Sequence, residues 1–205
     1  MEMVALESTA SPHFADFVRL YESSFPPYER EPLDEVRGQI DSPVDPQRFW
    51  NFVGVRSGAV VAILRLGYLP ETQVGFVVHI AVDPSVRGQG LGGEVLEFAH
   101  AHCQNVDAGF RGLILEVERA EDAEDPEAMV ERSRRVEWFQ RHGAQFISRA
   151  YTQPSLGPGL PPVILNLMMI GEVPANPRTM VADFYAEAWG LEPEHPFVRR
   201  ALRPS

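Results

Sequence analysis

The sequence contains very little cysteine, because Cys103 is the only one among 205 residues. A single cysteine cannot form a disulfide within the chain, which excludes a disulfide-stapled scaffold and predicts a reducing, cytoplasmic location. Long apolar runs are missing too. The longest strongly apolar run, 163–170, has the length of a strand, so we expect no membrane-spanning helix. The first residues lack a basic start followed by an apolar stretch, and therefore no signal peptide is expected.

Basic residues are too few to balance the acidic ones, and the formal net charge is −11 at pH 7. Proteins that bind nucleic acids need a basic surface to displace counterions, so a nucleic-acid partner is not expected. An acidic surface is compatible with a cationic or amine substrate, although it usually serves only solubility.

Apolar residues are plentiful at 44%, which is enough to build a sizeable core. The length suits one domain, or one domain with a terminal extension. We predict a main domain over residues 1–172. Residues 173–205 are expected to form a helical extension that packs on this domain or on a partner subunit.

The spacing of apolar and turn residues predicts helices first and strands next. The expected elements of this part are a helix from Ser11-Pro12 to Phe25, a helix over Leu33–Ile40, and strands over Phe49–Val55, Ala59–Leu66 and Val74–Val82. Arg56-Ser57-Gly58 predicts a tight hairpin turn between the first two strands.

The remainder of the chain alternates between helices and strands. The expected elements are a helix from Gly90 to about Gln104, a strand over Leu113–Val117, a helix opened by Asp125-Pro126 and closed by Gly143, strands over Gln145–Tyr151 and Val163–Ile170, and a helix over Arg178–Trp189. This order predicts a single α+β or α/β domain.

The strongest local signal is the turn Arg87–Gly93, which follows a strand and leads into a helix. Glycines let the backbone approach a ligand closely and turn successive N–H groups into one concavity. The helix N-terminus adds partial positive charge, and Arg87 could contact a phosphate directly. The turn therefore indicates a pyrophosphate site.

Two other interpretations of the turn remain open. Gly88, Gly90 and Gly93 also match the G-x-G-x-x-G dinucleotide fingerprint, and Glu116 and Glu118 lie where a ribose-binding acid would follow. A dinucleotide fold, however, normally starts with that unit and adds further strand–helix repeats. The second alternative is a purely structural turn.

Three motifs in order resemble those of the GNAT acetyltransferase superfamily. The sequence V-R-G-Q-G-L-G, preceded by A-V-D-P, is similar to that family's R-x-x-G-x-G turn. L-E-V-E at 115–118 is similar to its fifth strand, and R-V-E-W-F-Q-R-H-G-A at 135–144 to its late helix. The resemblance covers residues 14–170.

This resemblance implies a GNAT fold, with a mixed, mostly antiparallel, twisted sheet of six to seven strands that is flanked by helices and splayed between strands 4 and 5. It also implies acetyl-CoA as co-substrate, with no metal. The residues expected to bind acetyl-CoA are Ile80, Ala81, Val82, Arg87, Gly88, Gln89, Gly90, Leu91, Gly92, Gly93 and Phe139.

The implied reaction is direct attack of a primary amine on the thioester, which needs a base to take the amine proton. Glu116 matches the Glu that is the base in the similar strand of ribosomal-protein N-terminal acetyltransferases, and Glu118 on the same strand face is the alternative. His79 has the opposite parity to the residues that face the site, so a packed histidine is expected there.

One position departs from the family pattern. Phe139 stands where the family commonly has a Tyr that protonates the leaving sulfur; water or Tyr151 could take that role. The departure keeps a second hypothesis open, an acyl-CoA-binding sensor or interaction protein with little turnover. A nicotinamide-dependent oxidoreductase is the third. The expected acceptor is a small amine or a peptide N-terminus, with walls formed by F-P-P-Y-E-R and Q-P-S-L-G-P-G-L-P-P, and a homodimer is possible.

Overall fold

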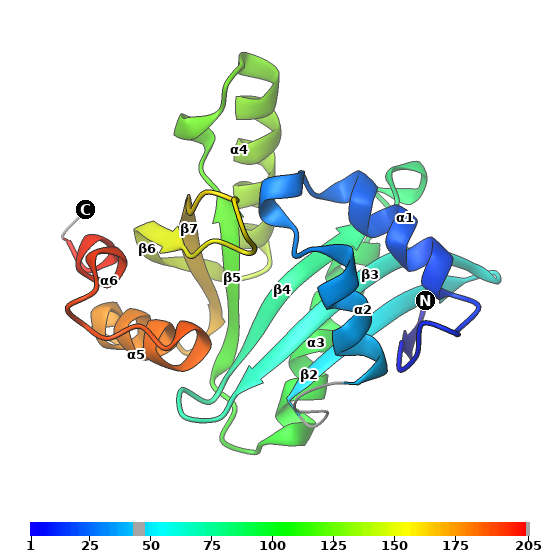
Figure 1. Cartoon of the computed structure of the whole chain (residues 1–205), viewed down its shortest axis with the longest axis horizontal. Coiled ribbons are helices and arrows are strands. Elements are labelled where there is room, and N and C mark those ends of the chain that lie inside the picture. The colour runs from blue at the N-terminus through cyan, green and yellow to red at the C-terminus, as the bar shows by residue number, and fades with distance from the viewer. Residues whose placement is uncertain (43–47, 204–205) are drawn as a thin grey trace. The chain divides into compact units, whose positions relative to one another are not determined.

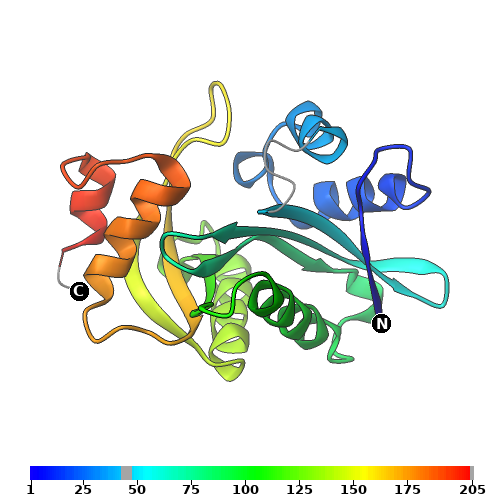
Figure 2. The same ribbon diagram turned by 90° about the horizontal axis from the view of Figure 1, so that it is seen from below.

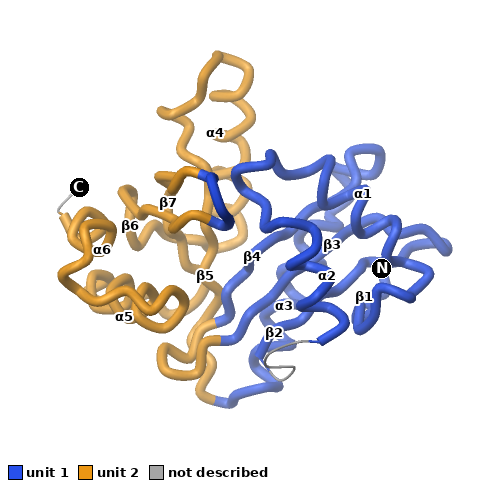
Figure 3. The backbone as a smooth tube through the Cα atoms, viewed as in Figure 1, with its two compact units in different colours: residues 1–68, 75–108, 156–160 blue, residues 69–74, 109–155, 161–205 orange. Residues whose placement is uncertain are grey.

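The computed structural model describes residues 1–42 and 48–203. Its chain forms two compact units, which Figure 3 shows in different colours. Unit 1 comprises residues 1–68, 75–108 and 156–160, and unit 2 comprises 69–74, 109–155 and 161–205. Figure 1 labels the helices and strands of both units.

Unit 1 is built on four strands in the order β1-β2-β3-β4. Its elements are β1 (Glu2–Ala5), α1 (Phe14–Ser24), the 3-10 turn η1 (Pro27–Glu29), α2 (Leu33–Asp41), β2 (Phe49–Arg56), β3 (Ala59–Leu69), β4 (Val74–Val82), the 3-10 turn η2 (Pro84–Val86) and α3 (Leu91–Val106). β1 pairs antiparallel with β2, and β2 with β3. The predicted hairpin turn is confirmed, because Ser57 (φ 51°) and Gly58 (φ 79°) both adopt the left-handed conformation that tight hairpins need.

Helices cover both faces of the unit 1 sheet, with α1 and α2 on one side and α3 on the other (Figure 2). This arrangement explains why β3 is buried along most of its length and has a nearly continuous apolar sequence. α1 contributes Phe17, Leu20 and Tyr21 to the core beneath it. Their spacing of three and four residues is the helical periodicity from which the helix was predicted.

Unit 2 contains three strands in the order β5-β7-β6, and both pairings are antiparallel. Its elements are β5 (Gly112–Glu118), the 3-10 turn η3 (Ala120–Asp122), α4 (Pro126–Arg141), β6 (Ala144–Gln153), β7 (Val163–Gly171), α5 (Pro177–Trp189) and α6 (Pro196–Ala201). Gly112 and Gly171 pair where β5 meets β7, and a Cβ on Gly112 would lie 2.2 Å from the carbonyl oxygen of Ile170. The close approach therefore requires glycine.

The predicted limits of α4 are confirmed by its end groups. The Asp125 side chain accepts a 2.8 Å hydrogen bond from the amide of Ala128, and Pro126 occupies the first helical position. Gly143, with φ 87°, follows the last turn. α5 likewise begins at the capping residue Asn176.

One expected element limit was wrong, and two short elements were not predicted. The first helix begins at Phe14 rather than Ser11-Pro12, because the Ser11 hydroxyl and carbonyl accept hydrogen bonds from His13 and Phe14 and form a turn there. Strand β1 was not predicted, since four residues beside β2 carry too little alternation to be recognised. The expected tail contains α6, which His195 caps.

Candidate active site

Side chains at the C-terminal end of β4 alternate between a buried and a partly exposed environment. His79 and Ala81 are buried, whereas Val78, Ile80 and Val82 are partly exposed. The His79 ring lies edge-on to Tyr21 and Phe25, with ring centroids 5.0 and 4.6 Å away, and its Nε2 is 2.9 Å from the Glu29 carbonyl oxygen. Burial lowers the pKa of His79 to about 4, with the charge of Arg65 acting in the same direction. The expectation of a packed histidine is confirmed.

The turn after β4 is held by Asp83. Its amide donates to the carbonyl of Val61 at 2.9 Å, and its carboxylate accepts from the amide of Ser85 at 3.0 Å. Arg19 of α1 donates to the same carboxylate at 3.0 Å. Hydrogen bonds from Ser85 and then from Arg19 lower the pKa of Asp83, so it stays ionised at neutral pH. These contacts fix the start of the turn before the glycines begin.

Free amides follow this fixed start. Within the part of the chain that the structure describes, the backbone N–H groups of residues 88–92 have no hydrogen-bond partner, and no side chain caps α3. Gly88 (φ 78°) and Gly90 (φ 82°) are left-handed, and a Cβ on either would meet nothing within 4 Å. The turn therefore presents a concave run of donors at a helix N-terminus, as an anion site requires.

Two arginines lie at this turn. The Nε of Arg87 donates to the Val82 carbonyl at 3.2 Å, which aligns the side chain with the end of β4. Arg56, from the β2–β3 hairpin, donates to the Gln89 side chain at 2.7 Å. Arg87 and Arg56 thus place positive charge beside the amides of residues 88–92 in unit 1, which suits a diphosphate.

Glu116 lies on β5 in unit 2, where two side chains of β6 bind it. The hydroxyl of Tyr151 donates to one carboxylate oxygen, and the side-chain amide of Gln153 donates to the other. Strand pairing explains the meeting, because Glu116 faces Leu167 of β7 and Tyr151 faces Leu165, two residues away on the same face. Figure 1 shows β5, β6 and β7 side by side.

Burial is the main influence on the pKa of Glu116. Burial raises the pKa of Glu116 to about 7, and the hydrogen bonds from Tyr151 and Gln153 oppose that shift. Tyr151 is itself fully buried, and burial with the nearby Glu116 charge raises its pKa well above 10. A carboxyl group that titrates near neutral pH is suited to take up and release a proton.

Glu118, the alternative base, has a different environment. Arg132 donates to it at 2.8 Å, and Arg135 forms a second ion pair with it; both arginines come from α4. Two arginine side chains occupy the oxygens of this carboxylate, which favours a structural role. Phe139, expected at the cofactor, lies on α4 with 5% of its surface exposed.

The Pro/Gly-rich loop, one of the two expected acceptor walls, approaches the start of α2 in unit 1. Gly157 of the Pro/Gly-rich loop lies beside Pro32, and a Cβ there would be 3.2 Å from the proline ring. Tyr28 of the first loop is 38% exposed. Just after this loop, the amide of Glu31 donates a hydrogen bond to the Tyr21 hydroxyl at 3.0 Å.

The remaining candidates have structural roles. Burial raises the pKa of Cys103 to about 12, so its thiol stays protonated at neutral pH. The His102 ring packs against Trp50 and Phe52, at centroid distances of 4.4 and 5.1 Å.

Among residues 1–42 and 48–203, no group of three His, Cys, Asp or Glu side chains could hold a metal ion. Within the same residues, no helix is long and apolar enough to cross a membrane.

The turn after β4 and the strands around it match a known family. The sequence model of the GNAT acetyltransferase family matches residues 14–125, more than half of the chain. The chain therefore belongs to the GNAT acetyltransferase family. Among curated proteins, none matches this sequence.

Solved structures agree with the family at the level of the fold. A protein described as a GNAT-family acetyltransferase from Bacteroides thetaiotaomicron has a TM-score of 0.72 and 23% identity, over 94% of this chain and 100% of that one. A spermidine N-acetyltransferase chimera of Vibrio cholerae SpeG and hSSAT has a TM-score of 0.60 and 15% identity, over 83% and 96%. The ribosomal-protein-S18-alanine N-acetyltransferase of Escherichia coli has a TM-score of 0.52 and 21% identity, over 85% and 97%. The predicted fold class, a GNAT fold with a mixed sheet of six to seven strands flanked by helices, is confirmed, and the sheet has seven strands.

Proposed function

We propose that this protein transfers an acetyl group from CoA to a primary amine by direct attack. The observation that carries the proposal is the carboxyl group of Glu116, whose pKa burial raises to about 7 and which forms no ion pair within residues 1–42 and 48–203. The family supplies the donor, since GNAT acetyltransferases use acetyl-CoA. Two of the structural neighbours are named N-acetyltransferases, one of them for spermidine and one for the alanine of ribosomal protein S18.

Separate groups of residues serve cofactor binding and proton transfer. The free amides of residues 88–92 and the Arg87 side chain bind the diphosphate of CoA, and Gly93 closes the first turn of the helix behind them. The main chain of Ile80, Ala81 and Val82 binds the pantetheine arm like an added strand. Phe139 contributes an apolar contact to the cofactor. No metal takes part.

Glu116 acts as the general base. The amine nitrogen attacks the thioester carbonyl carbon, its proton passes to the Glu116 carboxylate, the C–S bond breaks, and the CoA thiolate leaves. An ordinary thiol has a pKa of about 8.5, so the thiolate can leave without full protonation even though Phe139 has no hydroxyl. The products are an amide and CoA, and the proton balance closes when Glu116 releases its proton to solvent.

Turnover of acetyl-CoA with a panel of amines tests the proposal, with spermidine, amino-acid amides and an alanine-terminated peptide as acceptors. Release of the CoA thiol can be followed directly, because Cys103 is buried and gives little background. The chain has no lysine, so acetyl-lysine formed on a protein acceptor cannot come from the enzyme itself.

Glu116→Gln should lower kcat by about 10²–10⁴-fold with little change in CoA affinity. Glu118→Gln is the matched control, and kcat should fall far less. The kcat/KM of the native protein should rise with pH through a midpoint near 7, because the base must be ionised. If the kcat of Glu116→Gln equals that of the native protein, another group is the base.

A second candidate function is an acyl-CoA sensor with little turnover. The buried Phe139 favours it, because the position lacks the hydroxyl group that the family commonly uses. CoA binding without acyl transfer to any amine of the panel would support this alternative. The family match does not support a nicotinamide-dependent oxidoreductase.

We further propose a cytoplasmic location, a small amine or a peptide N-terminus as acceptor, no nucleic-acid or membrane partner, a possible homodimer, and a division into a domain at 1–172 and an extension at 173–205.

A further inference from the structure

Residues 151–153 of β6 connect Glu116 to α5: the side chains of residues 151 and 153 bind Glu116, and the backbone of residue 152 binds α5. Tyr151 and Gln153 are two residues apart, share one face of the sheet, and both donate to Glu116. Thr152 lies between them. Any movement of its backbone therefore displaces both donors at once.

The backbone of Thr152 is held from outside the sheet by α5. β6 is the edge strand of unit 2, so one side of it has no neighbouring strand to pair its N–H and C=O groups. The Tyr185 hydroxyl accepts a 2.8 Å hydrogen bond from the Thr152 amide and donates a 3.0 Å hydrogen bond to the Thr152 carbonyl. One side-chain group thus replaces a strand partner at this residue.

Ring packing strengthens the same connection. The rings of Tyr151 and Tyr185 have centroids 4.9 Å apart at an interplanar angle of 32°, and Phe184 is 5.9 Å from Tyr151. All three side chains are fully buried. Buried aromatic rings in such contact move little relative to one another.

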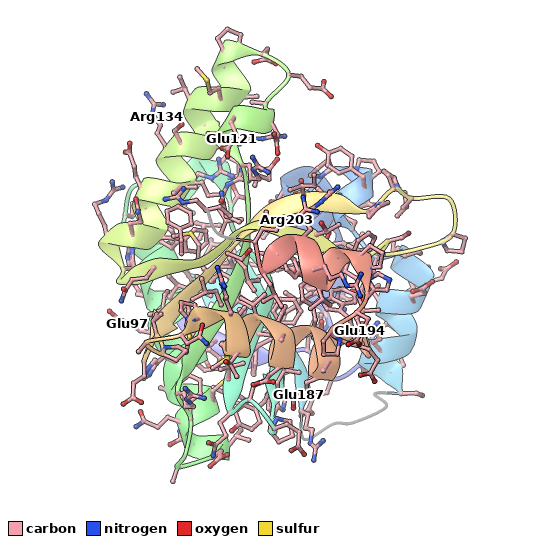
Figure 4. All side chains as sticks on the ribbon, turned by 90° about the vertical axis from the view of Figure 1, so that its left-hand side faces the viewer. Glu97, Glu121, Arg134, Glu187, Glu194 and Arg203 are labelled. Atoms are coloured by element: carbon pink, nitrogen blue, oxygen red, sulfur yellow. The ribbon has the colours of Figure 1, made fainter. Side chains whose placement is uncertain are left out.

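α5 is anchored at its other face as well. The Glu187 carboxylate accepts hydrogen bonds from the amides of Glu71 and Thr72, each at 2.8 Å, and from the Thr72 hydroxyl at 2.7 Å. Figure 4 labels Glu187 among the side chains of α5. The helix is therefore fixed on the segment 69–74 while Tyr185 reaches β6.

We propose that Tyr185 is a positioning residue for Glu116, and that α5 forms an integral part of the active site rather than an accessory extension. The proposal rests on the proposed function, in which Glu116 is the base. Tyr185 holds Thr152, Thr152 fixes Tyr151 and Gln153, and these two donors orient both carboxylate oxygens. The chain of contacts runs entirely through unit 2.

Other charged and polar groups of unit 2 lie near these contacts. Trp189 of α5 approaches the Tyr151 hydroxyl, and Arg200 of α6 acts on Tyr185. Glu118, on the same strand face as Glu116, is paired with Arg132 and Arg135 of α4. The influences on Glu116 are its burial and the bonds from Tyr151 and Gln153, so loosening β6 should act through those two bonds.

The test measures the Glu116 carboxyl directly by ¹³C NMR titration of the full-length protein, with the signal assigned by its absence in Glu116→Gln. Tyr185→Phe keeps the ring and removes the hydroxyl. Because the bonds from Tyr151 and Gln153 lower the pKa of Glu116, weakening them should raise it by about half a unit to one unit. The Thr152 amide should also exchange faster with solvent.

Tyr68→Phe is the matched control, because it removes another buried tyrosine hydroxyl, one that donates to Asp107 in unit 1. It should leave the Glu116 pKa and the Thr152 exchange unchanged. An unshifted Glu116 pKa in Tyr185→Phe overturns the proposal, and so does an equal shift in Tyr68→Phe. If Tyr185→Phe does not fold, Glu187→Gln should raise the Glu116 pKa by a smaller amount. Faster exchange of the Thr152 amide in Glu187→Gln with an unchanged Glu116 pKa would also overturn the proposal.

Activity separates this proposal from the proposed function. If Glu116→Gln turns over normally, the base assignment fails whatever the titration shows. If Glu116→Gln loses turnover while the pH profile of kcat/KM in Tyr185→Phe matches the native profile, the base stands and the positioning role fails. Joint success requires a midpoint that moves upward in Tyr185→Phe with the KM for acetyl-CoA unchanged.

Discussion

Arg65 is fully buried in the middle of β3 and forms an ion pair with Glu31, in the segment between α1 and α2. Its Nε also donates to the Asn51 side chain at 3.0 Å, and Gln39 accepts from the same guanidinium. Every donor edge of the buried charge thus meets an oxygen, which a buried arginine requires. The pair fixes the loop over the candidate acceptor side of unit 1.

Glu31→Ala should lower the free energy of unfolding by about 3–5 kcal/mol, because it leaves the Arg65 charge buried without a partner. Arg37→Ala, which breaks an exposed pair with Asp34 at 3.4 Å, is the control and should cost less than about 1 kcal/mol. Urea unfolding measures both. Equal losses in the two variants would mean that the buried pair contributes no more than a surface pair.

The same pair predicts a pH dependence. Burial alone would raise the pKa of Glu31, but the Arg65 charge and the Gln39 and Arg65 hydrogen bonds more than offset it, so the pKa lies below the ordinary 4.5. The stabilisation is therefore present above pH 4.5 and is lost as the pH falls below that value. The penalty of Glu31→Ala should shrink accordingly in acid.

Gly90→Glu should weaken CoA binding by at least about a hundredfold, because a carboxylate would stand where the amides of α3 meet the diphosphate. Gly90 has φ 82°, so any side chain also adds backbone strain. Gly90→Asn controls for the strain, since asparagine tolerates this conformation without adding charge. Calorimetric titration with CoA measures the affinities. A hundredfold loss in both variants would assign the effect to the backbone, and native affinity in Gly90→Glu would remove the turn from the CoA site.

Glu116→Gln should stabilise the protein, and more so as the pH rises. The pKa of Glu116 is raised from 4.5 to about 7 in the folded state, so its contribution is most favourable below pH 4.5 and is lost as the pH rises to about 7. The neutral amide avoids that loss, which amounts to roughly 3 kcal/mol above pH 7. Unfolding in urea at pH 5 and pH 8 measures the difference. Glu118→Gln should show the opposite sign at pH 8, because it removes ion pairs to two arginines.

The turn and its helix were predictable from the sequence because the information there is local. Glycine positions, the proline after Asp83 and the helical spacing of Leu91, Val95 and Leu96 lie within a few residues of one another. The same holds for the hairpin at Ser57-Gly58 and for the capped start of α4. Local backbone preference decides such features without reference to distant residues.

The partners of the candidate base were not predictable in the same way. Gln153 meets Glu116 across β7, and the order β5-β7-β6 is not visible in the chain order of these strands. Arg65 was missed because one charged residue in an apolar strand gives no sign of its partner, which is Glu31 in a loop of different periodicity. The one available signal was that charge itself, since an arginine inside a buried strand requires an acid nearby.

The C-terminal residues 173–205 should be required for unit 2 to fold. Residues 1–172 expressed alone should fail to fold unit 2, because α5 and α6 contribute Val181, Phe184, Tyr185 and Val198, all fully buried. Burial of each such side chain stabilises by about 1.5–3 kcal/mol, and together they approach the whole stability of a typical domain. The Ser148 hydroxyl would lose its 3.0 Å hydrogen bond to the Ala201 carbonyl, and the edge of β6 would be open to aggregation. Proteolysis within 144–171 and loss of cooperative unfolding would show this, and co-expression of residues 173–205 should restore the soluble protein. A truncated chain that unfolds cooperatively and resists protease would instead establish 1–172 as an independent domain, with α5 dispensable for the Glu116 site.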